Sequence, residues 1–72
     1  MSVFAQRLKD LRLENKITQA KIAIDIGVSD THYQRYEYSK SEPTLSVIVK
    51  LCEYFQVSSD YLLGLSDIKE RR

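Results

Sequence analysis

Glycine and proline are scarce in this sequence: among 72 residues there are two glycines and one proline. A β structure with many tight turns draws on both, because glycine reaches positive φ and proline presets the turn. Their scarcity therefore favours helices over a many-turned β fold. The hydrophobic share of 43% is typical of a globular chain rather than a disordered one, and this length allows one small domain.

Cysteine and long apolar runs are also nearly absent. The single Cys52 cannot form an internal disulfide, which fits a reducing cytosol, and we interpret it as a small core residue. No apolar run approaches the roughly 20 residues of a membrane span. Charges follow the first apolar residues at once, as in Arg7 and Lys9, so no signal peptide is expected. The sequence predicts a cytoplasmic protein that does not enter a membrane.

Groups that could support catalysis or metal binding are few. The chain has one His and one Cys, no paired ligands at metal spacing and no glycine-rich loop for phosphate. A domain this small also leaves little room for a sizeable pocket. We therefore expect no enzyme activity, no metal and no cofactor. The net charge of +1 shows no basic footprint for nucleic acid, although the placement of the charges matters more than their sum.

Helical periodicity, by contrast, recurs five times along the chain. The expected helices cover residues 3–15, 19–26, 30–38, 45–56 and 59–63, which predicts an all-α fold of five short helices. The domain is expected to comprise residues 1–65, and residues 66–72 to form a short charged tail that frays from Ile68 onwards unless a partner holds it. The buried side of the fourth helix is expected to contain Leu45, Ile48, Leu51, Cys52 and Phe55.

The most informative segment covers residues 18–37. Two short helical patterns are separated there by a break at residues 27–29. Thr18 and Ser29 suit helix N-caps, and Gly27 suits the position after a helix, where φ is positive. Two helices joined by a short turn containing glycine form a helix-turn-helix, whose second helix can lie in the DNA major groove. Many all-α proteins contain an ordinary helical hairpin, so this pattern alone is weak evidence.

The order of residue types is more specific. Residues 18–29 read TQAKIAIDIGVS, and Tyr36 and Glu37 follow. This segment resembles the phage repressor and Cro-type helix-turn-helix family of DNA-binding regulators, in which the pattern is roughly T-Q-x-x-[LI]-A-x-x-[LI]-G-[VI]-S. The flanks are similar to the family too, so the resemblance covers almost the whole chain. The sequence departs from the family at Lys16 and Ser39, where glycine is common.

The resemblance implies a lambda-repressor-like fold whose third helix enters the major groove of double-stranded DNA. Arg35 is the strongest candidate for reading a base, because its planar fork can bind guanine O6 and N7 together. Asp30 can accept from cytosine N4 or can simply stabilise the positive end of its own helix, and both interpretations stay open. The candidates for base contact are Asp30, Thr31, Gln34 and Arg35.

Contacts with the DNA backbone are expected near helix N-termini, where unpaired N–H groups suit phosphate. In the family, the residue at the position of Gln19 binds a phosphate. Lys21 stands where family members often carry an acidic residue, and it is either a surface residue without a role or a phosphate ligand. The candidates for phosphate contact are Gln19, Lys21, Lys40, Ser41 and Thr44.

Two further expectations follow from the resemblance. Family members contain a partly buried ion pair, which corresponds here to Arg12 and Glu37. They also usually act as two-fold dimers on palindromic sites. We expect an apolar, C-terminal dimer interface, with the candidates Tyr54, Tyr61, Leu62, Leu65 and Ile68, although Tyr61 and Leu62 could equally be core residues.

Together these features predict a sequence-specific transcriptional regulator that binds double-stranded DNA as a homodimer, with repression the expected mode. The main alternative is a protein-interaction module that keeps the fold and has weak or no DNA binding. The low net charge and the carboxylate of Asp30 favour that alternative. A third hypothesis is an antitoxin that binds both DNA and a toxin.

Overall fold

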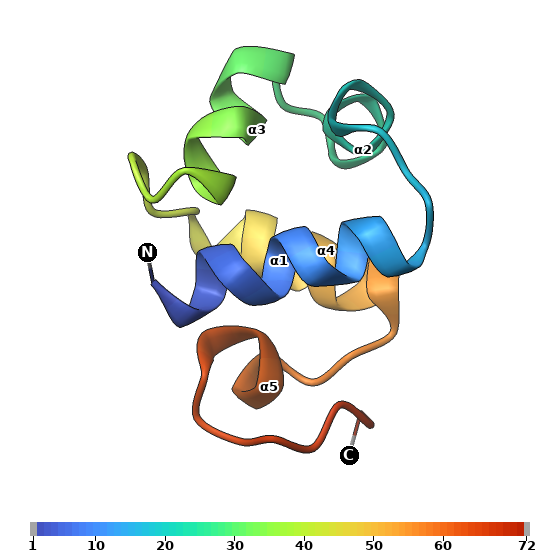
Figure 1. Cartoon of the computed structure of the whole chain (residues 1–72), viewed down its shortest axis with the longest axis vertical. Helices are drawn as coiled ribbons and strands as arrows, with labels where there is room; N and C mark the ends of the chain where they lie inside the picture. Colours follow the sequence, from blue (N-terminus) through green and yellow to red (C-terminus); the bar gives the residue numbers. More distant parts are fainter. Residues whose placement is uncertain (1, 72) are drawn as a thin grey trace.

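The computed structural model describes residues 2–71, and within them it contains five helices and no strand. The prediction of an all-α fold is confirmed, and each predicted helix boundary agrees with the structure to within one residue. Figure 1 shows the helices labelled in chain order. Their bounds are α1 Val3–Glu14, α2 Gln19–Ile26, α3 Asp30–Glu37, α4 Leu45–Phe55 and α5 Ser59–Leu63.

A serine or threonine caps the N-terminus of each of these five helices. In each case its side-chain oxygen accepts a hydrogen bond from the backbone N–H three residues further on, so one unpaired donor of the first turn is satisfied. Each cap of this kind contributes about 1 kcal/mol to helix stability. The five caps are Ser2, Thr18, Ser29, Thr44 and Ser58.

Each helix is followed, within two residues, by a residue with a left-handed backbone conformation, and these residues are not all glycines. Gly27 and Gly64 have φ values of 78° and 86°, as expected for residues without a Cβ. Lys16, Ser39 and Gln56 have φ values of 56°, 59° and 55°. The two departures from the family pattern, Lys16 and Ser39, therefore keep the backbone conformation that glycine would adopt and carry the steric cost of a side chain.

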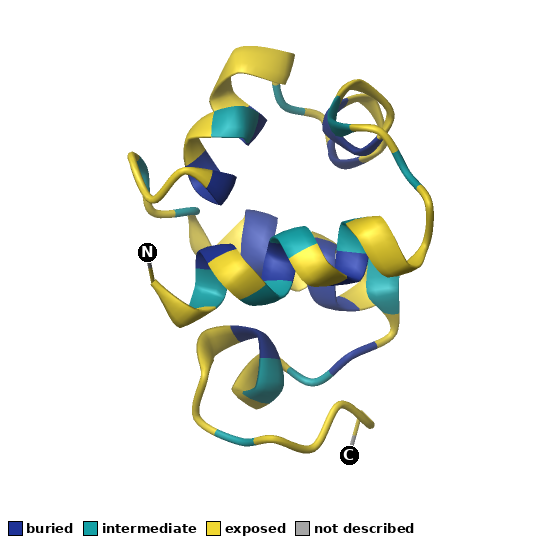
Figure 2. Ribbon diagram, viewed as in Figure 1, coloured by how far each residue is buried: buried dark blue, intermediate teal, exposed yellow. Residues whose placement is uncertain are grey.

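The helices pack around one core. In Figure 1, α1 crosses the middle of the molecule in front of α4, α2 and α3 lie on one side of this pair, and α5 and the C-terminal segment lie on the other. Figure 2 shows the buried residues on the inward sides of the helices. Leu8, Ile22, Tyr33, Leu51 and Leu62 are fully buried. This core fixes α3 by its inner side and leaves its outer side exposed.

The predicted buried side of α4 is wrong at its first residue. Leu45 is 85% exposed, and the buried residues of α4 are Val47, Ile48, Leu51 and Cys52. At 100° per residue, Leu45 lies roughly 90° from the centre of that buried side. The apolar spacing from Leu45 to Ile48 was therefore not evidence that Leu45 faces the core.

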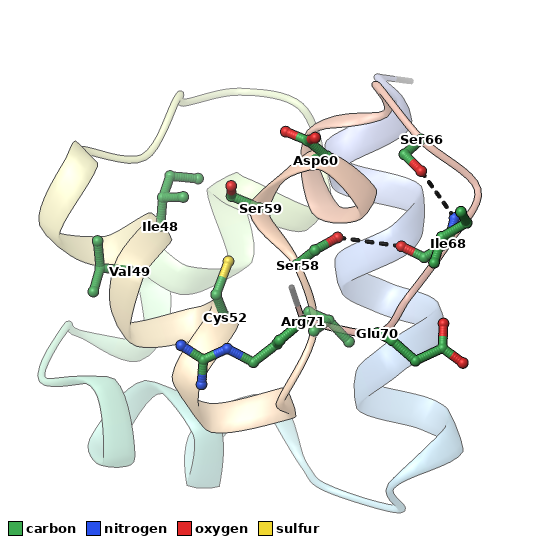
Figure 3. A pocket seen from close by; sticks show the side chains of 11 residues that line it. Ile48, Val49, Cys52, Ser58, Ser59, Asp60, Ser66, Ile68, Glu70 and Arg71 are labelled. Atoms are coloured by element: carbon green, nitrogen blue, oxygen red, sulfur yellow. Dashed lines mark hydrogen bonds between the residues drawn. The ribbon is translucent and has the colours of Figure 1, made fainter.

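The segment predicted to fray at the C-terminus makes hydrogen bonds with the domain in the part that the structure describes. The Arg7 guanidinium donates to the carbonyl oxygens of Tyr61 and Ser66. The Ser58 N–H donates to the Lys69 carbonyl oxygen at 2.9 Å, and the Ser58 hydroxyl donates to the Ile68 carbonyl oxygen at 3.2 Å (Figure 3). Residues 66–71 therefore lie against the domain.

Across residues 2–71, no helix combines the length and the apolar character that crossing a membrane would require.

Candidate nucleic-acid interface

The turn between α2 and α3 is closed by backbone bonds and by one lysine. The N–H of Gly27 donates to the Ile24 carbonyl oxygen at 3.2 Å, and the N–H of Val28 donates to the Ala23 carbonyl oxygen at 3.0 Å. Lys50, from α4, donates its Nζ to the Ile26 carbonyl oxygen at 3.4 Å. The positive charge of Lys50 also interacts favourably with the negative, C-terminal end of the α2 dipole. These contacts fix the C-terminal end of α2, where the turn towards α3 begins.

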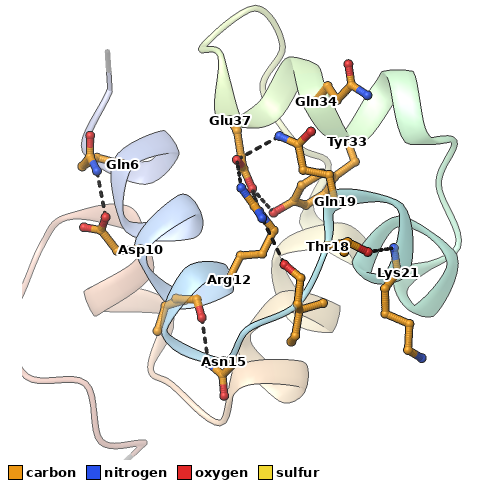
Figure 4. Close-up of polar contacts among 12 residues, drawn as sticks. Gln6, Asp10, Arg12, Asn15, Thr18, Gln19, Lys21, Tyr33, Gln34 and Glu37 are labelled. Atoms are coloured by element: carbon orange, nitrogen blue, oxygen red, sulfur yellow. Dashed lines mark hydrogen bonds and ion pairs between the residues drawn. The ribbon is translucent and has the colours of Figure 1, made fainter.

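On the inner side of α3, a buried carboxylate accepts hydrogen bonds from four donor atoms (Figure 4). Glu37 is 1% exposed. It accepts from Arg12 Nε at 2.6 Å and from Arg12 Nη2 at 3.1 Å. It also accepts from Gln19 Nε2 at 3.1 Å and from the Tyr33 hydroxyl at 2.5 Å. A carboxylate offers about four lone-pair positions, so this Glu37 cluster of Glu37, Arg12, Gln19 and Tyr33 satisfies it completely.

The Glu37 cluster joins three helices. Arg12 belongs to α1, Gln19 opens α2, and Tyr33 and Glu37 belong to α3. Arg12 Nη1 also donates to the Ile17 carbonyl oxygen at 3.0 Å, just before α2. The sequence indicated the pairing of Arg12 with Glu37 but missed Gln19 and Tyr33 as partners. The available signal was the i, i+4 spacing of Tyr33 and Glu37, together with the need of a buried tyrosine hydroxyl for a partner.

The environment fixes the protonation states in this cluster. Burial alone would raise the pKa of Glu37, but the hydrogen bonds from Arg12, Tyr33 and Gln19 outweigh it and hold the pKa below its usual value. Burial and the neighbouring Glu37 raise the pKa of Tyr33. The hydrogen bond to Glu37 raises the pKa of Arg12. At neutral pH, Glu37 is therefore charged and Tyr33 remains a donor.

The outer side of α3 carries the candidates for base contact. Asp30, Thr31 and Arg35 are exposed and Gln34 is half-buried. The Gln34 amide donates to Asp30 Oδ1 at 3.2 Å, and Arg35 Nε donates to the Ser41 hydroxyl at 3.1 Å. Figure 4 shows Gln34 directed away from Glu37. The structure thus brings all four candidates to one surface, outside the buried cluster.

The candidates for phosphate contact are mostly engaged within the chain. The Gln19 amide donates inward to Glu37, and Lys21 pairs with Asp25 at 2.8 Å. Thr44 Oγ1 accepts from the N–H of Val47, as the cap of α4. Ser41 accepts from Arg35, and Lys40 is exposed in the α3–α4 loop.

Burial corrects one of the candidates for the dimer interface. Leu62 is fully buried and belongs to the core, so it does not lie on an exposed surface. The Tyr54 hydroxyl donates to Asp25 at 2.7 Å, and the Tyr61 ring lies 4.2 Å from the guanidinium carbon of Arg7. Leu65 and Ile68 are 76% and 44% exposed.

A helix-turn-helix family model matches residues 8–62. This chain belongs to the phage repressor and Cro-type helix-turn-helix family. Helix-turn-helix proteins of this type are regulators rather than enzymes. The chain is 38% identical over 65 residues to the uncharacterized HTH-type transcriptional regulator YobD of Bacillus subtilis, covering 90% of this chain and 58% of YobD. It is 37% identical over 59 residues to the transcriptional repressor RstR of the cryptic phage CTXphi in Vibrio cholerae, covering 82% of this chain and 53% of RstR.

The chain therefore spans a little over half the length of these curated relatives. Among solved structures, the P22 c2 repressor in complex with a synthetic operator matches this helix-turn-helix protein with a TM-score of 0.83 and 30% identity. The match covers 92% of this chain and all of that one. The LexA repressor from Eubacterium rectale, at 23% identity and a TM-score of 0.80, shows the shared fold alone.

Proposed function

We propose that this helix-turn-helix protein is a sequence-specific transcriptional regulator, with repression the expected mode, that reads the major groove of double-stranded DNA with α3. The observation that carries the proposal is the contrast between the two sides of α3. Its inner side is fixed by the saturated Glu37 carboxylate, and its outer side presents Asp30, Thr31 and Arg35 to solvent. Base reading needs such a rigid support, because small displacements of a contacting side chain lose the contact.

The exposed groups suit different base edges. The guanidinium of Arg35 suits guanine O6 and N7, the methyl group of Thr31 suits the thymine methyl, and the amide of Gln34 suits adenine. The Asp30 carboxylate is an acceptor and suits the amino group of cytosine. Backbone contacts would come from Lys40 and the N-termini of α2 and α4, and these fix register without reading sequence.

We propose further that the protein acts as a homodimer on a palindromic operator. Two hollows flank Ile48: one is lined by Val49 and Ile68 (Figure 3) and the other by Leu45 and Leu63. We call the four exposed apolar residues around them the α4 face: Leu45, Val49, Leu63 and Ile68. An isologous contact needs projections and hollows on one surface, and the α4 face offers both.

Charge and size support a second copy as the partner of the α4 face. Lys40 and Glu42 line the same hollow as Leu45, so a two-fold arrangement can set each charge against its opposite on the other copy. The protein measures 30 × 22 × 21 Å. Two copies side by side can therefore place their α3 helices about 34 Å apart, which is one turn of DNA. A cytoplasmic location is part of this proposal, because a bacterial regulator meets DNA there.

The test is selection of bound sequences from random duplexes, with the wild-type protein and with Arg35→Ala. We expect a two-fold symmetric motif for the wild type. Arg35→Ala should lose the preference at one base pair of each half-site, at a cost of about 1–3 kcal/mol in discrimination. Lys9→Ala, which also removes a long cationic side chain but lies on α1 outside the interface, is the matched control.

A motif unchanged at every position by Arg35→Ala would overturn the assignment of Arg35. A wild-type protein that binds no duplex even at low salt, where phosphate contacts are strongest, would instead favour the protein-interaction module. A toxin co-purifying with the protein would favour the antitoxin.

A further inference from the structure

The loop between α3 and α4 folds back onto Arg35. The N–H groups of Lys40 and Ser41 both donate to the Arg35 carbonyl oxygen, at 2.8 and 3.3 Å. The left-handed conformation of Ser39, with a φ of 59°, turns the chain so that both N–H groups reach this one carbonyl. The position of Ser41 is therefore fixed relative to the backbone of Arg35 itself.

The side chains of Arg35 and Ser41 are also in contact. Arg35 Nε donates to the Ser41 hydroxyl at 3.1 Å. Ser41 is half-buried, whereas Arg35 is exposed. Among the ion pairs of residues 2–71, none involves Arg35. The contact that orients this guanidinium is therefore a neutral hydroxyl, which leaves its charge uncompensated.

The Ser41 contact uses one particular donor of the guanidinium. Arg carries five N–H donors in a rigid, planar fork. With Nε bonded to Ser41, the terminal Nη1 and Nη2 groups have no hydrogen-bond partner within residues 2–71 and remain as a pair of donors. Guanine O6 and N7 are two neighbouring acceptors, which match a pair of parallel donors.

We infer that Ser41 is a positioning residue for DNA reading: it holds the Arg35 guanidinium in the orientation that binds guanine, rather than contacting a phosphate as the sequence suggested. The inference rests on the proposed function. A long exposed side chain loses rotamer freedom when it binds, and a group that orients it beforehand lowers that cost. The benefit of Ser41 should therefore appear only at the base pair that Arg35 reads.

The test is a double-mutant cycle on two duplexes, the selected operator and the same operator changed at the base pair read by Arg35. Dissociation constants are measured at one salt concentration for the wild type, Ser41→Ala, Arg35→Ala and the double variant. We expect Ser41→Ala to reduce the preference for the operator about three- to tenfold, the range for one lost hydrogen bond, and to have no effect on that preference in the Arg35→Ala background.

Two further variants keep the result interpretable. Ser41→Thr retains the hydroxyl and should retain the preference. Ser46→Ala removes a hydroxyl that contacts Thr44 and not Arg35, and should leave the preference unchanged. Thermal unfolding of each variant checks that the fold persists.

Equal weakening on both duplexes by Ser41→Ala, in both backgrounds, would overturn the inference and identify Ser41 as a phosphate contact, because phosphate contacts carry no sequence information. A wild-type protein without any preference would overturn the proposed function and the inference together. A preference that Arg35→Ala abolishes and Ser41→Ala leaves intact would overturn the inference alone.

Discussion

Four donors converge on the carboxylate of Glu37, and the loss of any one of them leaves a lone pair without a partner in the interior. Such a loss costs about 1–3 kcal/mol, because the stranded group has given up water without replacement. The loss of the carboxylate charge is more serious, since it leaves the guanidinium of Arg12, with a side chain only 12% exposed, without a counter-charge. The orientation of α3 therefore depends on a few polar atoms as much as on apolar packing.

This arrangement predicts a specific pH dependence. The folded-state pKa of Glu37 is held below its ordinary value of 4.5, so the unfolded chain binds the proton more readily. The stabilising contribution is then complete above about pH 4.5 and is lost as the pH falls towards the folded-state pKa. Glu37→Gln should be less stable than the wild type at pH 7 by about 2 kcal/mol or more, and this difference should shrink on acidification.

Urea unfolding of both proteins from pH 7 to pH 3 measures the effect. Other carboxylates titrate in both proteins, so the difference between the two curves isolates Glu37. A difference that stays constant over the whole pH range would show that Glu37 does not titrate in this way.

Among the secondary-structure elements, the helix ends carry avoidable strain. Lys16 follows α1 with a φ of 56°, which costs a residue with a Cβ about 1 kcal/mol or more. Lys16→Gly removes that strain but adds backbone entropy to the unfolded chain. We expect a net gain of about 0.5 kcal/mol or more and a melting temperature raised by roughly 2–4 °C. Lys16→Ala keeps the Cβ and is the control: a melting temperature no higher for the glycine variant than for the alanine variant would contradict the prediction.

The boundaries of these elements could be predicted from the sequence because they depend on neighbouring residues. Thr18 and Ser29 satisfy N–H groups only three residues away, and the requirement for positive φ at Gly27 is equally local. The ion pair of Arg12 and Glu37 was also indicated, but only through the family resemblance.

Contacts between residues far apart in the sequence were not predictable in the same way. The outward direction of Leu45 depends on where α4 begins and on what packs against its other side. Leu62 is buried in the core formed by residues from the other helices. The contact of residues 66–71 with the domain includes Arg7, which bonds to Tyr61 and Ser66 more than fifty positions later. No residue near Tyr61 or Ser66 in the sequence indicates that Arg7 is their partner. For the same reason, the bond between Arg35 and Ser41 could not be inferred before the loop conformation was known.

For the whole molecule, the proposal to test is self-association through the α4 face. Leu45→Glu places a charge within the proposed contact and should convert a dimer into a monomer, because burying an unpaired carboxylate is costly. Sedimentation of the protein without DNA measures the change. Ile24→Glu, at an equally apolar residue that is 76% exposed on α2, should have no effect. If the leucine variant sediments as the wild type does, or both variants dissociate alike, the α4 face is not the interface.

The Glu37 cluster takes none of its hydrogen bonds from the outer side of α3, where Asp30 bonds to Gln34 and Arg35 bonds to Ser41. The residues that would choose an operator are thus energetically separate from those that hold the helix. A lineage of such proteins could acquire new targets by exchanging residues 30, 31, 34 and 35 with little loss of stability, and an engineer could transplant another reading surface onto the same framework.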